Sequence, residues 1–457
     1  MERQKTLKFV DLIGMAFAAF MSLEVVASQA AMGPSMVFCF VVIGGVYFVL
    51  HALICSELGG AYPDQGGIYV WVKKAYGDKW AARTTWWYWV NVVGFIPSAF
   101  VVMGTVFQQL FMPDMSVWGM VVMCIVFTWV IVLMNALPLK YTKLIPNISS
   151  VCKAVACLAL IGGAGYALAT RGSASEFSAQ TMLPELNLGF FALIPVYVYS
   201  LTGLDLMSCS AGEMENPKRD VPRSVFTSGV LAIVMYIITA CALLVLMPQG
   251  EIDESSGVID ALIQVFGSNK VVLYALGAAI VFSFLGYALS WALGGNKAAQ
   301  EAGEFGELPA IFAKTSKSGA PMGAGILLGI ASTVLLLVYG FTASSNEGLF
   351  WTLLAFTSII FFLPYIVMSF VLITLRKKDK TTPRPFRIPG PDWVSTLIAV
   401  VHAVLLVASA IFYFIAPEGE DPLVYALVLG VGVVIALTLG EYLVSRSMKK
   451  SRAQAEK

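Results

Sequence analysis

Apolar runs long enough to cross a lipid bilayer recur along almost the whole chain. A membrane-spanning helix needs roughly 20 mostly apolar residues. About twelve such runs can be marked, near 8–31, 35–58, 86–111, 117–137, 146–170, 188–211, 226–247, 271–300, 323–342, 348–375, 394–416 and 423–446. The polar stretches between them are short. The pattern therefore predicts an all-α polytopic membrane protein with no inserted soluble domain.

Composition agrees with this pattern. Of the 457 residues, 58% are hydrophobic and 12% are charged, and the mean hydropathy is +0.80, far from the averages of soluble domains. The first apolar run is too long for the hydrophobic region of a cleavable signal peptide, so we expect it to be retained as the first helix. The aromatic residues at 86–89 are interpreted as a belt at the membrane interface.

The distribution of basic residues predicts the orientation of the chain, because Lys and Arg collect in cytoplasmic loops. With both termini inside, only Arg171 and Lys270 of the 29 Lys and Arg residues fall in outer loops. The outer loops hold acids instead, at Glu251, Asp253, Glu254, Glu418, Glu420 and Asp421. We therefore expect a multi-pass protein of the cell inner membrane, surrounded by lipid and without a nucleic-acid partner. The sequence leaves open whether it forms a homodimer.

Groups that would indicate enzymatic or metal chemistry are scarce. The seven cysteines lie inside apolar segments without a C-x-x-C pair, so neither disulfides nor a zinc site is expected. His51 in the second span and His402 in the eleventh are far apart in sequence, and we interpret them as isolated packing residues. No Ser-His-Asp set or phosphate-binding glycine loop is found. The chain is not expected to be an enzyme or to need a cofactor or metal.

Two predicted helices carry an acidic residue in the middle of a run of small residues. The first span contains Ser22-Leu23-Glu24, and the sixth contains Gly203-Leu204-Asp205. Secondary transporters are often built from inverted repeats in which one helix of each half is interrupted at a midplane substrate site. We therefore predict a first inverted repeat over 8–170, a second over 188–375 and two additional helices over 394–446.

A carboxylate at mid-bilayer depth costs about 2.5–3.5 kcal/mol on insertion scales and persists where it has a partner or a function. Glu24 and Asp205 therefore either accept N–H groups at a helix break or pair with a base, or they face a cationic substrate or carry protons. The candidate basic partner is Lys153 in the fifth span, unless its side chain extends to the inner interface. Aromatic rings stabilise a desolvated cation by roughly 2 kcal/mol, and Tyr199 and Trp291 are the candidates to supply them.

Three sequence elements resemble those of the amino acid-polyamine-organocation transporters. Residues 57–69, ELGGAYPDQGGIY, resemble the family's E-L-x4-P-x2-G-G-x-Y element after the second span. Residues 212–223, GEMENPKRDVPR, resemble its E-x2-N-P-x-R-x-[VI]-P element, and Leu308-Pro309 with Phe312 resembles its LP-x2-F element. The resemblance extends over essentially the whole chain. It implies a LeuT-like 5+5 inverted repeat with broken first and sixth helices, alternating access, and an architectural and gating role for these elements.

The resemblance also implies roles for single residues. Tyr199 stands where related exchangers of arginine and agmatine have an aromatic gate, and Asp205 where they have an acid of the sixth-helix break. Trp291 stands where they have a tryptophan of the eighth helix. Lys153 resembles the fifth-helix lysine of sodium-independent members, so sodium coupling is not expected.

The first span departs from the family pattern. Amino acid carriers of the family commonly have a G-[SA]-G break whose N–H groups hold the substrate carboxylate, whereas residues 20–24 read FMSLE. An acid at this place would repel a substrate carboxylate and favours a cationic amine. The span is similar to that of the branch with bacterial agmatine-putrescine exchangers, whose first helix also carries an acid followed by a run like Ala27 to Gly33. The resemblance implies an antiporter of amines such as putrescine or agmatine, with Glu24 as a binding residue. We expect Ser22, Ser28 and Gly203 to line the same site.

Two other classes stay open. An amino acid exchanger or a proton-coupled amino acid importer is the alternative, because the similar glutamate-GABA exchangers handle carboxylates. Glu24 or Asp205 would then titrate during the transport cycle, and Lys153 would respond to the change in charge. A channel or a non-transporting receptor is the third class.

Overall fold

The computed structural model describes residues 22–63, 67–137, 144–203, 217–316, 319–417 and 419–455. Within these ranges every element of regular secondary structure is a helix. The α-helices are α2 (Val26–Ala31), α3 (Met36–Phe38), α4 (Gly45–Ala61), α5 (Ile68–Tyr76), α6 (Asp78–Phe111), α7 (Val117–Asn135), α9 (Leu144–Thr170), α10 (Leu188–Ser200), α12 (Pro217–Leu246), α13 (Gly257–Phe266), α14 (Lys270–Glu304), α15 (Met322–Thr342), α16 (Asn346–Lys378), α17 (Asp392–Phe412) and α18 (Pro422–Ala455). Short 3-10 segments are η1 (Leu23–Val25), η2 (Gly33–Ser35) and η5 (Gln249–Glu251), and η3 (Cys39–Gly44) is π-helical.

The described residues contain 10 helices that are long and apolar enough to cross a membrane. The other two predicted spans are the first and the sixth, of which only parts are described. Several helices extend beyond the predicted apolar runs: α6 begins at Asp78, and α18 continues to Ala455. A helix of 34 residues is about 51 Å long, whereas the hydrocarbon core is about 30 Å thick. The added polar turns therefore stand outside the hydrocarbon.

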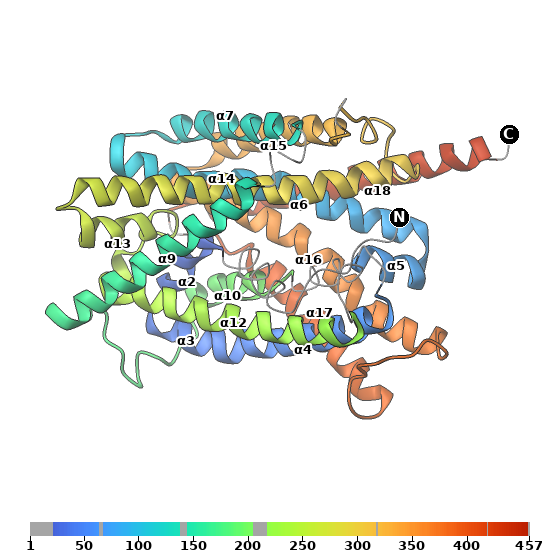
Figure 1. Ribbon diagram of the computed structural model, residues 1–457, viewed down its shortest axis with the longest axis horizontal. Helices are drawn as coiled ribbons and strands as arrows, with labels where there is room; N and C mark the ends of the chain where they lie inside the picture. The colour runs from blue at the N-terminus through green and yellow to red at the C-terminus, as the bar shows by residue number, and fades with distance from the viewer. Residues whose placement is uncertain are drawn as a thin grey trace.

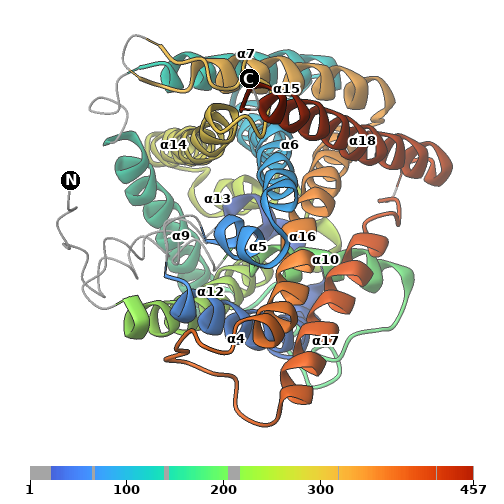
Figure 2. The same ribbon diagram turned by 90° about the vertical axis from the view of Figure 1, so that its right-hand side faces the viewer.

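The long helix α6 stands at the centre of the bundle. It packs against α14 and α16, and 94% of its most hydrophobic window is buried. Seen along the helix axes, α7 and α15 lie together on one side of it, and α4, α12 and α17 lie on the other (Figure 2). In the view across the helices, α5 and the last turns of α18 mark one end of the bundle and α13 marks the opposite end (Figure 1). We refer to these as the α5 end and the α13 end.

The outward faces of the peripheral helices are apolar. Large exposed hydrophobic side chains include Leu133 on α7, Leu158 on α9, Phe341 on α15 and Ile435 on α18. Only 28% of the most hydrophobic window of α9 and 22% of that of α18 are buried. Apolar surface of this extent is suited to contact with lipid rather than water. The chain is a multi-pass membrane protein.

At both predicted breaks the described backbone departs from helical geometry. The helix α10 ends at Ser200, Leu201 leaves helical geometry, and Gly203 has a φ of +104°, a conformation that favours glycine. In the first span, Ser22 has an extended backbone immediately before the 3-10 turn η1. Asp205, which was predicted at the sixth-helix break, lies outside the described residues.

Candidate functional site

The first-helix break is held between two helices from different parts of the bundle. The Ser22 N–H donates to the Tyr236 hydroxyl oxygen on α12 at 3.0 Å, and the Ser22 hydroxyl lies 2.7 Å from the Tyr287 hydroxyl on α14. All three residues are buried. Because a buried N–H that leaves the helical ladder needs another acceptor, these contacts allow Ser22 to stay extended. Glu24 then follows in the first turn of η1.

Glu24 is a buried acid, and neither of its carboxylate oxygens has a hydrogen-bond partner among the described residues. Lys153 on α9 is also buried, at 2% exposure, and its ammonium lies 4.0 Å from the centroid of the Tyr287 ring. The charge of Lys153 is close enough to act on Glu24. The alternative that Lys153 extends to the inner interface is therefore wrong. Opposite charges and an aromatic ring share one buried region.

The two predicted aromatic residues belong to one cluster. The centroid of the Trp291 ring lies 5.4 Å from that of Phe95 and 5.9 Å from that of Phe361. The Tyr199 ring lies 6.1 Å from the same Phe361 ring, and Tyr88 lies 6.0 Å from Trp291. Phe361 thus connects Tyr199 and Trp291 into a wall that α6, α10, α14 and α16 build together.

The acid and the aromatic wall are adjacent. Tyr287 contacts Ser22 through its hydroxyl, and its ring centroid lies 6.4 Å from that of Trp291. Ser28 follows Glu24 by one turn and is buried, with a hydroxyl that has no partner among the described residues. An acid, unbonded polar groups and aromatic faces are the groups that a cationic organic molecule requires.

Four residues of this region were not predicted: Phe95, Tyr236, Tyr287 and Phe361. The position of Tyr287 carried a signal, because it precedes Trp291 by four residues on one helix and therefore shares its face. Phe95 and Phe361 lie among many other apolar residues of buried helices, where no local pattern separates a site residue from a packing residue.

The prediction of an interfacial belt at 86–89 was wrong for its buried members. The Trp86 indole N–H donates to the Ala436 carbonyl at 2.9 Å, and that of Trp89 donates to the Asn296 side chain at 3.0 Å. Tyr88 is part of the aromatic wall. The physical reason is the central place of α6, where aromatic side chains meet other helices instead of lipid headgroups.

The prediction that the histidines are isolated was also wrong. His51 Nδ1 on α4 lies 3.1 Å from His402 Nε2 on α17, and His402 Nδ1 lies 2.8 Å from the Ser369 hydroxyl. The Tyr47 hydroxyl lies 3.4 Å from His51 Nδ1 and 2.9 Å from the hydroxyl of Thr202, at the interruption after α10. The histidines therefore belong to a buried network that reaches the sixth-helix interruption.

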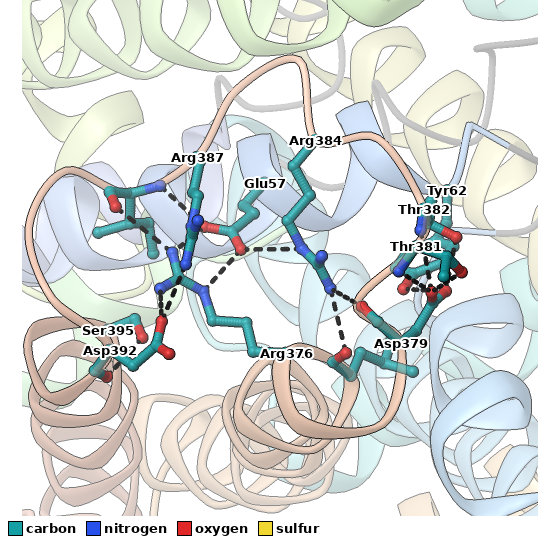
Figure 3. Close-up of polar contacts among 12 residues, drawn as sticks. Glu57, Tyr62, Arg376, Asp379, Thr381, Thr382, Arg384, Arg387, Asp392 and Ser395 are labelled. Carbon is teal, nitrogen blue, oxygen red and sulfur yellow. Dashed lines mark hydrogen bonds and ion pairs between the residues drawn. The ribbon is translucent and has the colours of Figure 1, made fainter.

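At the α5 end, Glu57 connects the end of α4 to α16 and to the loop that follows it (Figure 3). Arg376 donates to the two carboxylate oxygens at 2.7 and 2.5 Å. The Arg384 guanidinium lies 3.3 Å from Glu57, and the Ile388 N–H donates to it at 2.8 Å. The side chains of Glu57 and Arg376 are 1% and 6% exposed. We name this set the Glu57 clamp; its burial agrees with the architectural role implied for this element.

A second contact at the α5 end joins α5 to the segment after α14. The Tyr69 hydroxyl donates to Glu307 Oε1 at 2.6 Å, and the Lys73 ammonium lies 3.7 Å from the same carboxylate. Burial is the main cause that raises the pKa of Tyr69, and the hydrogen bond to Glu307 is the second. The hydroxyl therefore stays protonated and remains a donor. Tyr69 belongs to the family-like element over 57–69, and Glu307 directly precedes the element that begins at Leu308. These two elements therefore contact each other.

A buried acid and an aromatic wall within a bundle of membrane-spanning helices are typical of membrane transporters. The chain belongs to the amino acid permease family, since the model of that family matches residues 7–434. It is a transporter and not an enzyme.

Individual relatives cover nearly the whole chain. The chain is 29% identical to the probable agmatine/putrescine antiporter of Lactococcus lactis subsp. lactis strain IL1403, over 94% of this chain and 93% of the relative. It is 27% identical to an uncharacterized transporter of Legionella pneumophila, over 91% and 90%. It is 21% identical to the glutamate/gamma-aminobutyrate antiporter of the same Lactococcus strain, over 88% and 82%.

Proposed function

We propose that the protein is an antiporter of cationic amines, such as putrescine or agmatine, that works by alternating access. Glu24 carries this proposal, because its two buried oxygens have no hydrogen-bond partner among the described residues. An ionised carboxylate in this state is costly. A substrate ammonium or guanidinium would supply the missing donors, and the wall of Tyr199 and Trp291 would cover its methylene chain.

The first-helix break supports a substrate without a carboxylate. A carboxylate-binding break offers bare N–H groups, whereas the Ser22 N–H is already bonded to Tyr236. A substrate carboxylate would also be repelled by Glu24. The name of the Lactococcus agmatine/putrescine relative supports the same substrate class.

The proposed cycle uses the predicted repeats. Segments 8–170 and 188–375 would move relative to each other around the site, with 394–446 outside this movement. Lys153 would respond to the charge at Glu24 as substrate enters and leaves, so that no sodium ion is needed. Asp205 is proposed as a further acid at the sixth-helix break.

We further propose that the α5 end faces the cytoplasm, with both chain termini on that side of the inner membrane. The α13 end carries Arg171 and Lys270, whereas the α5 end carries a larger number of basic residues, among them Lys73, Arg83 and Arg376. Cytoplasmic loops are enriched in such residues.

The test is ligand-induced stabilisation of the purified full-length protein against heat. Putrescine, cadaverine and agmatine should raise the unfolding midpoint of the wild type and should not raise that of Glu24→Gln. Glu251→Gln, which removes an exposed acid at the α13 end, is the matched control and should respond like the wild type. Undiminished putrescine binding by a folded Glu24→Gln variant would overturn the proposal.

The second candidate is an amino acid exchanger or a proton-coupled amino acid importer. The glutamate/gamma-aminobutyrate relative favours it, as does the nearness of Lys153 to Glu24, which suits a titrating pair. Stabilisation only by ligands that carry a carboxylate would support this candidate. So would accumulation driven by an imposed proton gradient in the absence of a counter-substrate.

A further inference from the structure

The segment between η5 and α13 closes the α13 end of the bundle over α2. Gly257 approaches α2 so closely that a Cβ atom added to it would lie 3.3 Å from the Cβ of Ala27. The Thr105 hydroxyl on α6 donates to the Ser255 carbonyl at 3.0 Å. The segment is therefore packed against both the first span and the central helix.

Glu254 brings a carboxylate into this closure. Its N–H donates to Glu347 Oε1 on α16 at 3.1 Å, so a second carboxylate is adjacent. Glu254 Oε2 is buried and has no hydrogen-bond partner within hydrogen-bond geometry among the described residues. The Ser28 hydroxyl lies beside the same carboxylate. No Lys or Arg among those residues forms an ion pair with Glu254. Burial, together with the charges of Glu347 and Asp253, raises the pKa of Glu254 well above its ordinary value.

Ser28 relates the position of Glu254 to that of Glu24. Ser28 follows Glu24 by four residues, about 6–7 Å along the helix. A diamine with four methylene groups spans about 6 Å between its nitrogens when extended. Because Ser28 lies one turn from Glu24 and contacts Glu254, the two acids stand on the same side of α2, where one diamine can reach both.

We propose that Glu254 determines specificity for dicationic amines. When the α13 end closes, its carboxylate binds the second charge of an amine whose first charge is held by Glu24. The inference rests on the proposed function, since it requires an amine in the site. It assigns the preference for two charges to the closing segment, in addition to any contribution of Asp205.

A monocationic amine would leave the half-buried Glu254 carboxylate beside Glu347, with no substrate charge to compensate it. The charge of Glu347 opposes ionisation of Glu254, so the closed state would then favour a proton on Glu254. A dicationic amine places its second positive charge beside Glu254, so this proton is not needed. The closed state therefore favours dicationic amines over monocationic ones. Loss of one charge-assisted contact should weaken binding at least about tenfold, which corresponds to about 1.4 kcal/mol.

The test compares putrescine with butylamine, which has the same four-carbon chain and a single charge, by titration calorimetry on the purified full-length protein. The wild type should bind putrescine at least about tenfold more tightly than butylamine. Glu254→Gln should keep the affinity for butylamine and lose most of this preference. The control Glu251→Gln should keep it, and thermal unfolding of each variant shows whether it is folded.

A measurement on the wild type is independent of any variant. Putrescine binding should release a proton from Glu254, detected as a dependence of the binding heat on the ionisation enthalpy of the buffer, and butylamine binding should release less. The assignment would be overturned if folded Glu254→Gln kept the preference for putrescine, or if the preference were lost only in Asp205→Asn. Equal proton release by the two amines, or equal binding of both by the wild type, would overturn it as well. Binding of neither amine would instead contradict the proposed function itself.

Discussion

Replacement of Arg376 by Gln should destabilise the protein by about 3 kcal/mol through loss of the Glu57 clamp. Arg376 contacts both oxygens of the buried Glu57 carboxylate, at 2.7 and 2.5 Å (Figure 3). Removal of one partner of a buried ion pair costs about 3–5 kcal/mol, because an uncompensated charge stays buried. Arg384 and the Ile388 N–H would still contact Glu57, at 3.3 and 2.8 Å. We therefore expect the lower end of this range.

Thermal unfolding of the purified protein measures the effect. At roughly 2 °C per kcal/mol for large domains, the midpoint should fall by about 6 °C. The double variant Glu57→Gln/Arg376→Gln should recover part of this loss, since it removes the unpaired carboxylate, while Arg384 then loses its acidic partner but keeps its backbone acceptors. The matched control is Arg387→Gln, which breaks only an exposed contact with Asp392 in the same loop and should leave the midpoint unchanged. Additive losses in the double-mutant cycle, or an equal loss in Arg387→Gln, would refute the reasoning.

Two further predictions concern the charges around the proposed substrate. Lys153→Met should lower the unliganded thermal midpoint, because Glu24 loses a buried basic neighbour, and it should enlarge the upward shift caused by putrescine, whose ammonium replaces the missing charge. Equal putrescine shifts in the variant and the wild type would contradict this. Putrescine affinity, measured by titration calorimetry, should fall as the pH is lowered from about 8 to about 5. The pKa of Glu254 is raised in the unliganded protein, so a larger fraction of Glu254 carries a proton as the pH falls, and this proton must leave before the carboxylate can bind a cation. Butylamine affinity should fall less, and a flat profile for putrescine would exclude Glu254 as a titrating ligand.

The helical framework could be predicted because membrane spans are marked by length and composition alone. The interruptions were also predictable, since an acid surrounded by small residues inside an apolar run has few structural explanations. Ser22 and Gly203 indeed leave helical geometry at those places. The ends of the helices were predicted less well, because the polar turns of α6 and α18 beyond the hydrocarbon carry no hydropathy signal.

The walls of the site were only partly predictable, because they come from helices far apart in the sequence. His51 and His402 are 351 residues apart and meet because α4 packs against α17. Phe361 gave no signal among the apolar residues of α16. Glu254 was counted as one acid of an outer loop, and no local pattern indicates that this loop folds back onto α2. Lys153 had two interpretations that only its burial in the fold could separate.

The uneven exposure of the helices has a consequence for the surroundings of the protein. Less than a third of the hydrophobic window of α9 is buried, yet the inward face of this helix carries Lys153 beside Tyr287. Helices adapt to a thinner or thicker bilayer by tilting, at a cost of fractions of a kcal/mol per Å. A tilt of α9 would move Lys153 relative to Glu24, whereas α6 is shielded from lipid by its neighbours. The acyl-chain length of the membrane therefore affects the distance between Lys153 and Glu24, and with it the electrostatic interaction at the site.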